Sequence, residues 1–138
     1  MGTICKIAYQ NNNSVDCITC YNDGAIESVG KMLSEIYNTK KYVSMIINRG
    51  NLAKLGTNLK KFDKEKNVNG TVDNYQWKGK KIPKKSYKDI SGIVEDEREA
   101  QYIYYFKDEI WYAMKVLEDD GELKPYLSEF YELNSLFS

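Results

Sequence analysis

The sequence predicts an α+β fold, in which an antiparallel sheet built from two hairpins carries two or three helices on one face. Three observations predict it: two β-favouring segments joined by a polar turn near the start, apolar residues at helical spacing from 26 to 49, and an aromatic hairpin over 102–116. The chain has 138 residues, of which 42% are hydrophobic, so we expect a single domain over 1–138.

The first hairpin is predicted over residues 3–10 and 15–21, which are rich in β-favouring side chains. The intervening run of asparagines suits a tight turn. A turn centred between Asn12 and Asn13 would place Cys5 opposite Cys20, so a reversible cross-strand disulfide is a side hypothesis. The Cys-x-x-Cys spacing of Cys17 and Cys20 falls in a strand, where the two thiols point to opposite faces, and we interpret both as structural residues.

Two helices are expected next, over 26–38 and 40–49, each with an apolar face. Thr39 is the predicted cap of the second helix, and Gly50 is its stop signal. Residues 51–56 are expected to form a short turn that buries Leu52 and Leu55.

The middle of the chain, about 57–88, is predicted to be a basic, mobile loop region, with a short edge strand at 75–77. The pattern of residues 87–94 does not distinguish a helix from a strand. The aromatic hairpin over 102–106 and 110–116 is the expected centre of the sheet, and one of its tyrosine-bearing faces is expected to be exposed. An acidic turn at 118–122 and a closing helix near 125–133 follow.

The formal net charge is zero, but the charges are segregated along the chain. Residues 51–88 hold 11 basic and 3 acidic side chains, whereas residues 89–138 hold 4 basic and 13 acidic ones. Such asymmetry indicates charged partners. Pairing of the two segments within one chain, or between the subunits of a homo-oligomer, is the alternative.

Several kinds of chemistry lack their usual residues. The chain has three cysteines but no histidine. The absence of histidine excludes Ser-His-Asp catalysis, Cys-His catalysis and most catalytic zinc sites. No glycine pattern for phosphate binding is present. We therefore expect no enzymatic activity, no cofactor and no metal. With neither a membrane span nor a secretory leader in view, the expected location is the cytoplasm, with no membrane partner.

The basic segment predicts a nucleic-acid or nucleotide-signal contact, because lysines neutralise phosphates and aromatic rings stack on bases. A solvated lysine-rich loop is the alternative interpretation. The candidate contact residues are Lys60, Lys61, Lys64, Tyr75, Trp77, Lys80, Lys81, Lys84 and Lys85.

The acidic segment predicts a protein partner, since carboxylates on a rigid scaffold can imitate a phosphate backbone and occupy a basic groove. Tyrosines beside them are a residue type that interfaces favour. The alternative is that these acids keep a tyrosine-rich sheet soluble. The candidate partner-binding residues are Glu95, Asp96, Glu97, Glu99, Tyr102, Tyr104, Asp108, Glu109, Glu118, Asp119 and Asp120.

Five stretches resemble a group of small phage and mobile-element proteins: 18–24, 29–33, 37–39, 46–56 and 102–112. The group pattern reads I-Y-C-H-x-D-G-Y-P, then G-V-G-x-x-L, then Y-N-T. A helix followed by G-D-L-S-S-L-G comes next, and a hairpin Y-x-Y-L-F-K-D-G-x-W-Y closes the pattern. The basic middle is unmatched. This chain also has Tyr21 where the group has histidine, and Ala25 and Ile26 where it has Tyr-Pro.

The resemblance implies a small accessory protein of phage or mobile-element origin, and such proteins often bind and disable host machinery, including restriction and CRISPR systems. Together with the acidic segment, it leads to the first hypothesis: a non-enzymatic, anti-CRISPR-like inhibitor in the host cytoplasm. This inhibitor would bind a host defence protein, such as an RNA-guided nuclease complex, and block its nucleic-acid groove. The second hypothesis is nucleic-acid or nucleotide-signal binding through the lysines of 60–88.

Overall fold

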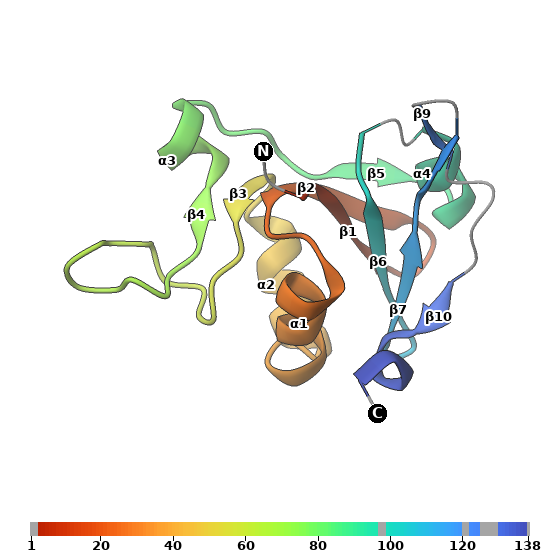
Figure 1. Ribbon diagram of the computed structural model, residues 1–138, viewed down its shortest axis with the longest axis horizontal. Coiled ribbons are helices and arrows are strands. Elements are labelled where there is room, and N and C mark those ends of the chain that lie inside the picture. The colour runs from red at the N-terminus through yellow and green to blue at the C-terminus, as the bar shows by residue number, and fades with distance from the viewer. Residues whose placement is uncertain (1–2, 97–98, 120–121, 125–129, 138) are drawn as a thin grey trace.

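The computed structural model describes residues 3–96, 99–119, 122–124 and 130–137. It is an α+β fold centred on an eight-stranded sheet, in the order β10-β7-β6-β1-β2-β3-β4 with β5 paired to β2 (Figure 1). The strands of this sheet are β1 (Cys5–Gln10), β2 (Val15–Asn22), β3 (Leu52–Lys54), β4 (Val72–Asp73), β5 (Lys85–Tyr87), β6 (Tyr102–Lys107), β7 (Ile110–Lys115) and β10 (Tyr131–Glu132). Strands β8 (Leu117–Asp119) and β9 (Glu122–Lys124) form a separate hairpin.

Both predicted hairpins of the sheet are present, β1 with β2 and β6 with β7. The prediction of an antiparallel sheet is met only in part: β1 pairs with β6 and β2 pairs with β3 in parallel, while the other pairings are antiparallel. The chain passes from β2 to β3 through helices, and such a crossover returns the next strand in the same direction. The sheet is therefore mixed.

The crossover begins with a π-helical turn, η1 (Ile26–Gly30), which continues into α1 (Lys31–Glu35), and it ends with α2 (Lys40–Asn48). Thr39 caps α2 as predicted, since its hydroxyl accepts a hydrogen bond of 3.3 Å from the backbone N–H of Tyr42. Gly50, with φ of 82°, ends the segment as predicted. Two short helices follow later, α3 (Asn74–Lys78) and α4 (Ile90–Asp96).

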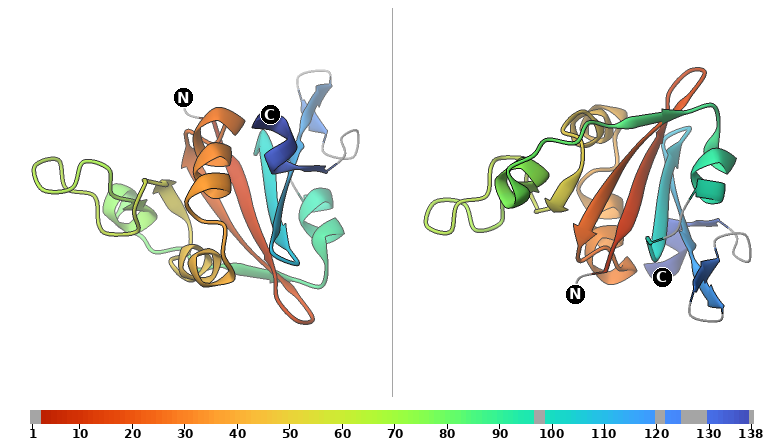
Figure 2. Two further views of the ribbon diagram at one scale, coloured as in Figure 1. Left: turned by 90° about the horizontal axis from the view of Figure 1, so that it is seen from below. Right: turned by 90° about the horizontal axis from the view of Figure 1, so that it is seen from above.

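Helices cover both faces of the sheet, and the prediction of helices on one face is wrong (Figure 2). The larger buried cluster joins α1 and α2 to one face of the sheet. A second cluster, on the other face, includes Ile93 of α4 with Ile103, Tyr105 and Met114. The sheet therefore has two apolar faces, and each needs a cover.

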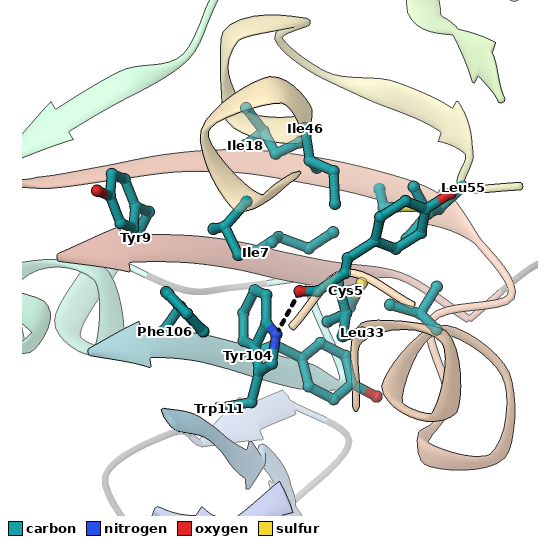
Figure 3. Packing of buried hydrophobic residues seen from close by; sticks show 14 of the residues in the cluster. Cys5, Ile7, Tyr9, Ile18, Leu33, Ile46, Leu55, Tyr104, Phe106 and Trp111 are labelled. Carbon is teal, nitrogen blue, oxygen red and sulfur yellow. Dashed lines mark hydrogen bonds between the residues drawn. The ribbon is translucent and has the colours of Figure 1, made fainter. Parts of the chain in front are cut away.

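Strand β6 shows why both faces are apolar. Tyr104 and Phe106 pack into the first cluster, while Ile103 and Tyr105 pack into the second. Figure 3 shows Tyr104, Phe106 and Trp111 among the side chains of the first cluster. All four β6 side chains are buried, so the expectation that one tyrosine-bearing face is exposed is wrong for them.

Two local predictions are also wrong. Leu52 and Leu55 are fully buried as expected, but residues 52–54 form strand β3 and not a turn. The predicted edge strand at 75–77 is the helix α3, which ends at Gly79 with a left-handed φ of 71°.

Cys5 lies opposite Cys20 in the β1–β2 register, as the turn position predicted. Both thiols are buried, and neither forms a disulfide. A hydrogen bond with Cys5 is the largest influence on the pKa of Cys20, which lies below its usual value.

At the end of the described chain, Tyr131 lies in β10, and the 3-10 helix η3 (Leu133–Phe137) follows. The closing helix predicted near 125–133 falls in part on residues 125–129, which lie outside the described residues. Among the helices that are described, none is long and apolar enough to cross a membrane.

Candidate nucleic-acid interface

Residues 57–83, which we call the basic arm, leave the sheet and return to it (Figure 1, yellow to green). The basic arm contains seven lysines and three acidic residues, so its formal charge is +4. It holds β4, α3 and two isolated bridges, Lys61 to Thr71 and Asp63 to Asn67. The sequence predicted a loop here, and the structure adds a folded-back shape.

Arg49 joins the two sides of the basic arm to the body. Its Nε and one terminal nitrogen each donate a hydrogen bond of 3.0 Å to the two carboxylate oxygens of Asp73. Its other terminal nitrogen donates to the carbonyl of Leu59. This bidentate pair is half-buried, so water screens it less than it screens an exposed pair.

The base of the arm is closed by hydrogen bonds between side-chain hydroxyls and backbone groups. The buried hydroxyl of Thr71 accepts from the N–H of Gly56 at 3.0 Å and donates to the carbonyl of Asn58 at 2.8 Å. A Cβ at Gly56 would lie 2.2 Å from the carbonyl oxygen of Asn69, so only glycine fits. Tyr37 donates to the carbonyl of Gly56 at 2.5 Å, and burial raises its pKa to about 12.

The far end of the arm is an ordered turn. The carboxylate of Asp63 accepts the backbone N–H groups of Glu65 and Lys66 at 2.8 and 3.0 Å, and these donors hold its pKa below the usual value. The side-chain amides of Asn58 and Asn67 bond each other across the arm at 3.1 and 3.0 Å. Hydrogen bonds between side-chain amides thus join the two sides of the arm, where backbone pairing is limited to isolated bridges.

Helix α3 presents the two exposed aromatic residues of the basic arm, Tyr75 and Trp77. Tyr75 is 65% exposed and Trp77 is 48% exposed. The Trp77 ring lies against Tyr21, with 5.8 Å between centroids, and Lys78 Nζ lies 4.2 Å from the Trp77 centroid. Because they are two residues apart on a helix, Tyr75 and Trp77 face different sides.

The predicted lysines divide into two groups. Lys84 bonds Asp16 at 3.3 Å, and Lys85 bonds Asp96 at 3.4 Å. The remaining lysines are exposed, and within the described part of the chain they make no ion pair: Lys60, Lys61, Lys64, Lys80 and Lys81. The exposed lysines of the basic arm therefore keep their charge, while Lys84 and Lys85, at the start of β5, are neutralised by the body.

The predicted acidic set does not form one surface among the described residues. Glu95, Asp96 and Glu99 are exposed before β6 begins, whereas Asp108 and Glu109 are exposed at the far end of the same strand. The six residues of β6 separate the two groups by about 20 Å.

Tyr104 is a core residue and not a contact residue, because it is fully buried and donates to the carbonyl of Gly24 at 2.7 Å. Tyr102 is half-buried and stacks on Tyr104. Glu97 and Asp120 lie outside the described residues, as do the side chains of Glu118 and Asp119.

Three further residues shape the interface, and the sequence patterns did not single them out as contact residues: Tyr21, Arg49 and Asn74. The available signal was Asp73-Asn74 before a short run that ends at Gly79, which is the pattern of a capped helix. The pairing of Arg49 with Asp73 joins positions 24 residues apart and has no local signal.

No group of three or more His, Cys, Asp or Glu side chains in the described chain is arranged to hold a metal ion. No protein family, curated protein or solved structure matches this chain.

Proposed function

We propose that this chain binds nucleic acid through the basic arm. One observation carries the proposal: five exposed lysines without an ion pair among the described residues share an anchored arm with the exposed rings of Tyr75 and Trp77. Lysine ammonium groups release counterions from phosphates, and exposed aromatic rings add stacking. A body that neutralises Lys84 and Lys85 but leaves the arm charged concentrates the positive potential on the arm.

The arm is held in shape, which favours binding. Arg49 with Asp73, and Thr71 with Gly56, fix its base, so its lysines start from a limited set of positions. Less ordering then accompanies binding, and more of the phosphate attraction remains as affinity. The predominance of lysine over arginine suits contacts to the phosphate backbone more than the reading of base edges.

Fluorescence anisotropy with a labelled 20-mer tests this. Binding by five phosphate contacts gives a slope of log affinity against log salt of about −3.5 for a single strand and about −4.5 for a duplex. A variant with alanine at Lys60, Lys61, Lys64, Lys80 and Lys81 should lose most of this slope. A control variant with alanine at the exposed Lys31, Lys41 and Lys115 should keep it. Absence of binding in low salt would refute the proposal.

A second candidate function is the phage-derived, anti-CRISPR-like inhibitor, which the tip of the β6–β7 hairpin supports. Asp108 and Glu109 are exposed there, with left-handed φ values of 51° and 62°. Both flanking strands belong to the core, so the tip presents two carboxylates from a rigid support. Such a tip suits insertion into a basic groove of a host defence protein.

This candidate is tested with purified RNA-guided nucleases and a DNA cleavage assay. The wild-type chain should slow cleavage, and replacing Asp108 and Glu109 by lysine should remove the inhibition. Glu35→Lys, on the exposed side of α1, is the matched charge reversal and should leave inhibition unchanged. Equal inhibition by the tip variant would refute this role for the tip.

A further inference from the structure

A small recess lies beside α3, at the root of the basic arm. Its volume is about 330 Å³, near the lower end of the ~300–1,000 Å³ range of ligand sites. Its lining residues are Arg49, Asn51, Asp73, Asn74, Tyr75 and Lys81. They come from the end of α2, the residue before β3, the end of β4, the first turn of α3 and the return of the arm.

The walls of this recess are fixed by hydrogen bonds among the lining residues and from these residues to their neighbours. Arg49 and Asp73 hold each other. Asn51 accepts from the N–H of Thr19 at 2.9 Å and donates to the hydroxyl of Tyr21 at 3.4 Å. These groups are therefore already arranged before any ligand arrives.

Asn74 has one group that the protein leaves unused. Its side chain is buried, with 4% exposure, and its amide nitrogen donates to the carbonyl of Lys80 at 2.7 Å. Its side-chain oxygen accepts no hydrogen bond from the described residues. Buried polar atoms in folded proteins nearly always have a partner. An acceptor of this kind in the wall of a recess points to a ligand N–H.

The other two features sit at the rim. Tyr75 is 65% exposed, so one face of its ring is open to stacking. The exposed ammonium of Lys81 makes no ion pair within the described part of the chain. A flat ring with N–H donors at its edge and a phosphate beside it matches the three features together.

We propose that the recess takes one unpaired base of a single-stranded nucleic acid. The base stacks on Tyr75, an N–H at its edge donates to Asn74 Oδ1, and a flanking phosphate pairs with Lys81. In a duplex the same edge is paired and both ring faces are stacked, so the recess selects single strands. This assignment depends on the proposed function of the basic arm, and it adds the strandedness of the ligand.

The test compares a 15-nucleotide oligo-dT, the matching oligo-U and a 15-base-pair duplex at one low salt concentration. Tyr75→Ala should weaken single-strand binding roughly 5- to 100-fold, the weight of stacking one base on an aromatic ring. Duplex binding should change less than about twofold. Tyr75→Phe keeps the ring and should bind as the wild type does.

The control is Tyr131→Ala, which removes a tyrosine of similar exposure, 55%, on β10. It should leave both affinities unchanged. Lys81→Ala should weaken single strands more than Lys60→Ala does. A selective loss on oligo-dT, on oligo-U or on both supports the recess, and the comparison of the two identifies the polymer.

Two outcomes overturn the inference and are distinguishable. In the first, Tyr75→Ala weakens the binding of single strands and duplex equally, or changes the binding of neither, while the lysine variants still reduce binding. The recess assignment then fails and the proposed function stands. If no nucleic acid binds in low salt, both fail together. Unchanged thermal midpoints for the Tyr75 variants show that the comparison concerns binding and not folding.

Discussion

The hairpin β6–β7 and the basic arm both contain aromatic residues, but the aromatic side chains are buried or half-buried in the hairpin and exposed on helix α3 of the arm. Phe106 and Trp111 are 2% and 5% exposed, whereas Tyr75 and Trp77 are 65% and 48% exposed. The neighbours explain the difference. In the hairpin the sequence neighbours of the rings include Ile103, Ile110 and Ala113, while in the arm the neighbours of the rings are Gln76, Lys78 and Gly79. Aromatic content alone therefore does not distinguish a core from a binding surface.

The polar ends of the rings follow the same division. In the core, Trp111 Nε1 donates to the carbonyl of Tyr37 at 2.8 Å. The dashed line at Trp111 in Figure 3 marks this hydrogen bond. Tyr104 likewise donates to the carbonyl of Gly24. On the arm, the described residues provide no such acceptor for Tyr75. A core ring needs a partner for its polar end, whereas an exposed ring has water.

Replacing Trp111 and Trp77 by alanine, one at a time, should give the largest difference in the free energy of unfolding between the two regions. Trp111→Ala should lower the free energy of unfolding by about 3–5 kcal/mol, since it empties a core site and leaves the carbonyl of Tyr37 unpaired. Trp77→Ala should change it by about 0.5 kcal/mol. Urea unfolding measures both. A large loss for Trp77→Ala would show that the arm belongs to the core.

Alkaline pH should weaken the core through its buried tyrosines. Burial raises the pKa of Tyr37 from 10.0 to about 12 and that of Tyr104 above its usual value. The folded state therefore favours the neutral phenols. The stabilisation from Tyr37 is fully present below pH 10 and is lost as the pH rises through 12, at a rate of up to about 1.4 kcal/mol for each pH unit.

The measurement is the urea midpoint between pH 9 and pH 12. Tyr37→Phe should show a shallower decline than the wild type, because it removes one of the ionising groups. The variant also loses the hydrogen bond to Gly56, so the slopes with pH are compared, not the absolute values. Identical slopes would contradict the assignment to Tyr37.

The smallest effect concerns the junction between the two regions. Arg49→Met should lower the free energy of unfolding by about 1–2 kcal/mol, because it breaks charge-assisted hydrogen bonds in a half-buried site. Its main result should be local: faster trypsin cleavage at the lysines of 60–66, seen by mass spectrometry. Asp73→Asn should act alike, and the double variant should add little. Additive losses would show that the two residues act separately.

The sequence predicted what depends on local pattern. Both hairpins, the cap at Thr39, the stop at Gly50 and the register of Cys5 with Cys20 follow from turn residues and periodicity. The parallel pairing of β1 with β6 does not, because it joins segments about 90 residues apart and has no local signal. The second apolar face was missed for a related reason: α4 is short, and its cover of Ile103 is a tertiary contact.

For the candidate site, residue type was predictable and surroundings were not. Lysine and aromatic content identified the arm, but only the fold separates Lys80 and Lys81 from the neutralised Lys84 and Lys85. Tyr104 was predicted as a contact residue from its type and is buried. The unused oxygen of Asn74 depends on helix α3, which the sequence suggested as a strand.

The parallel pairing of β1 with β6 also has a consequence for synthesis on the ribosome. Strand β1 is made first, and its parallel partner β6 begins at Tyr102. One edge of the β1–β2 hairpin therefore stays unpaired while roughly 90 further residues are added. At about 5–20 residues per second, the delay is about 5–20 s. During that time Cys5, Ile7 and Tyr9 border an unpaired strand edge. An unpaired apolar edge is a site of pairing between chains, so nascent copies on one messenger are most exposed to aggregation at β1.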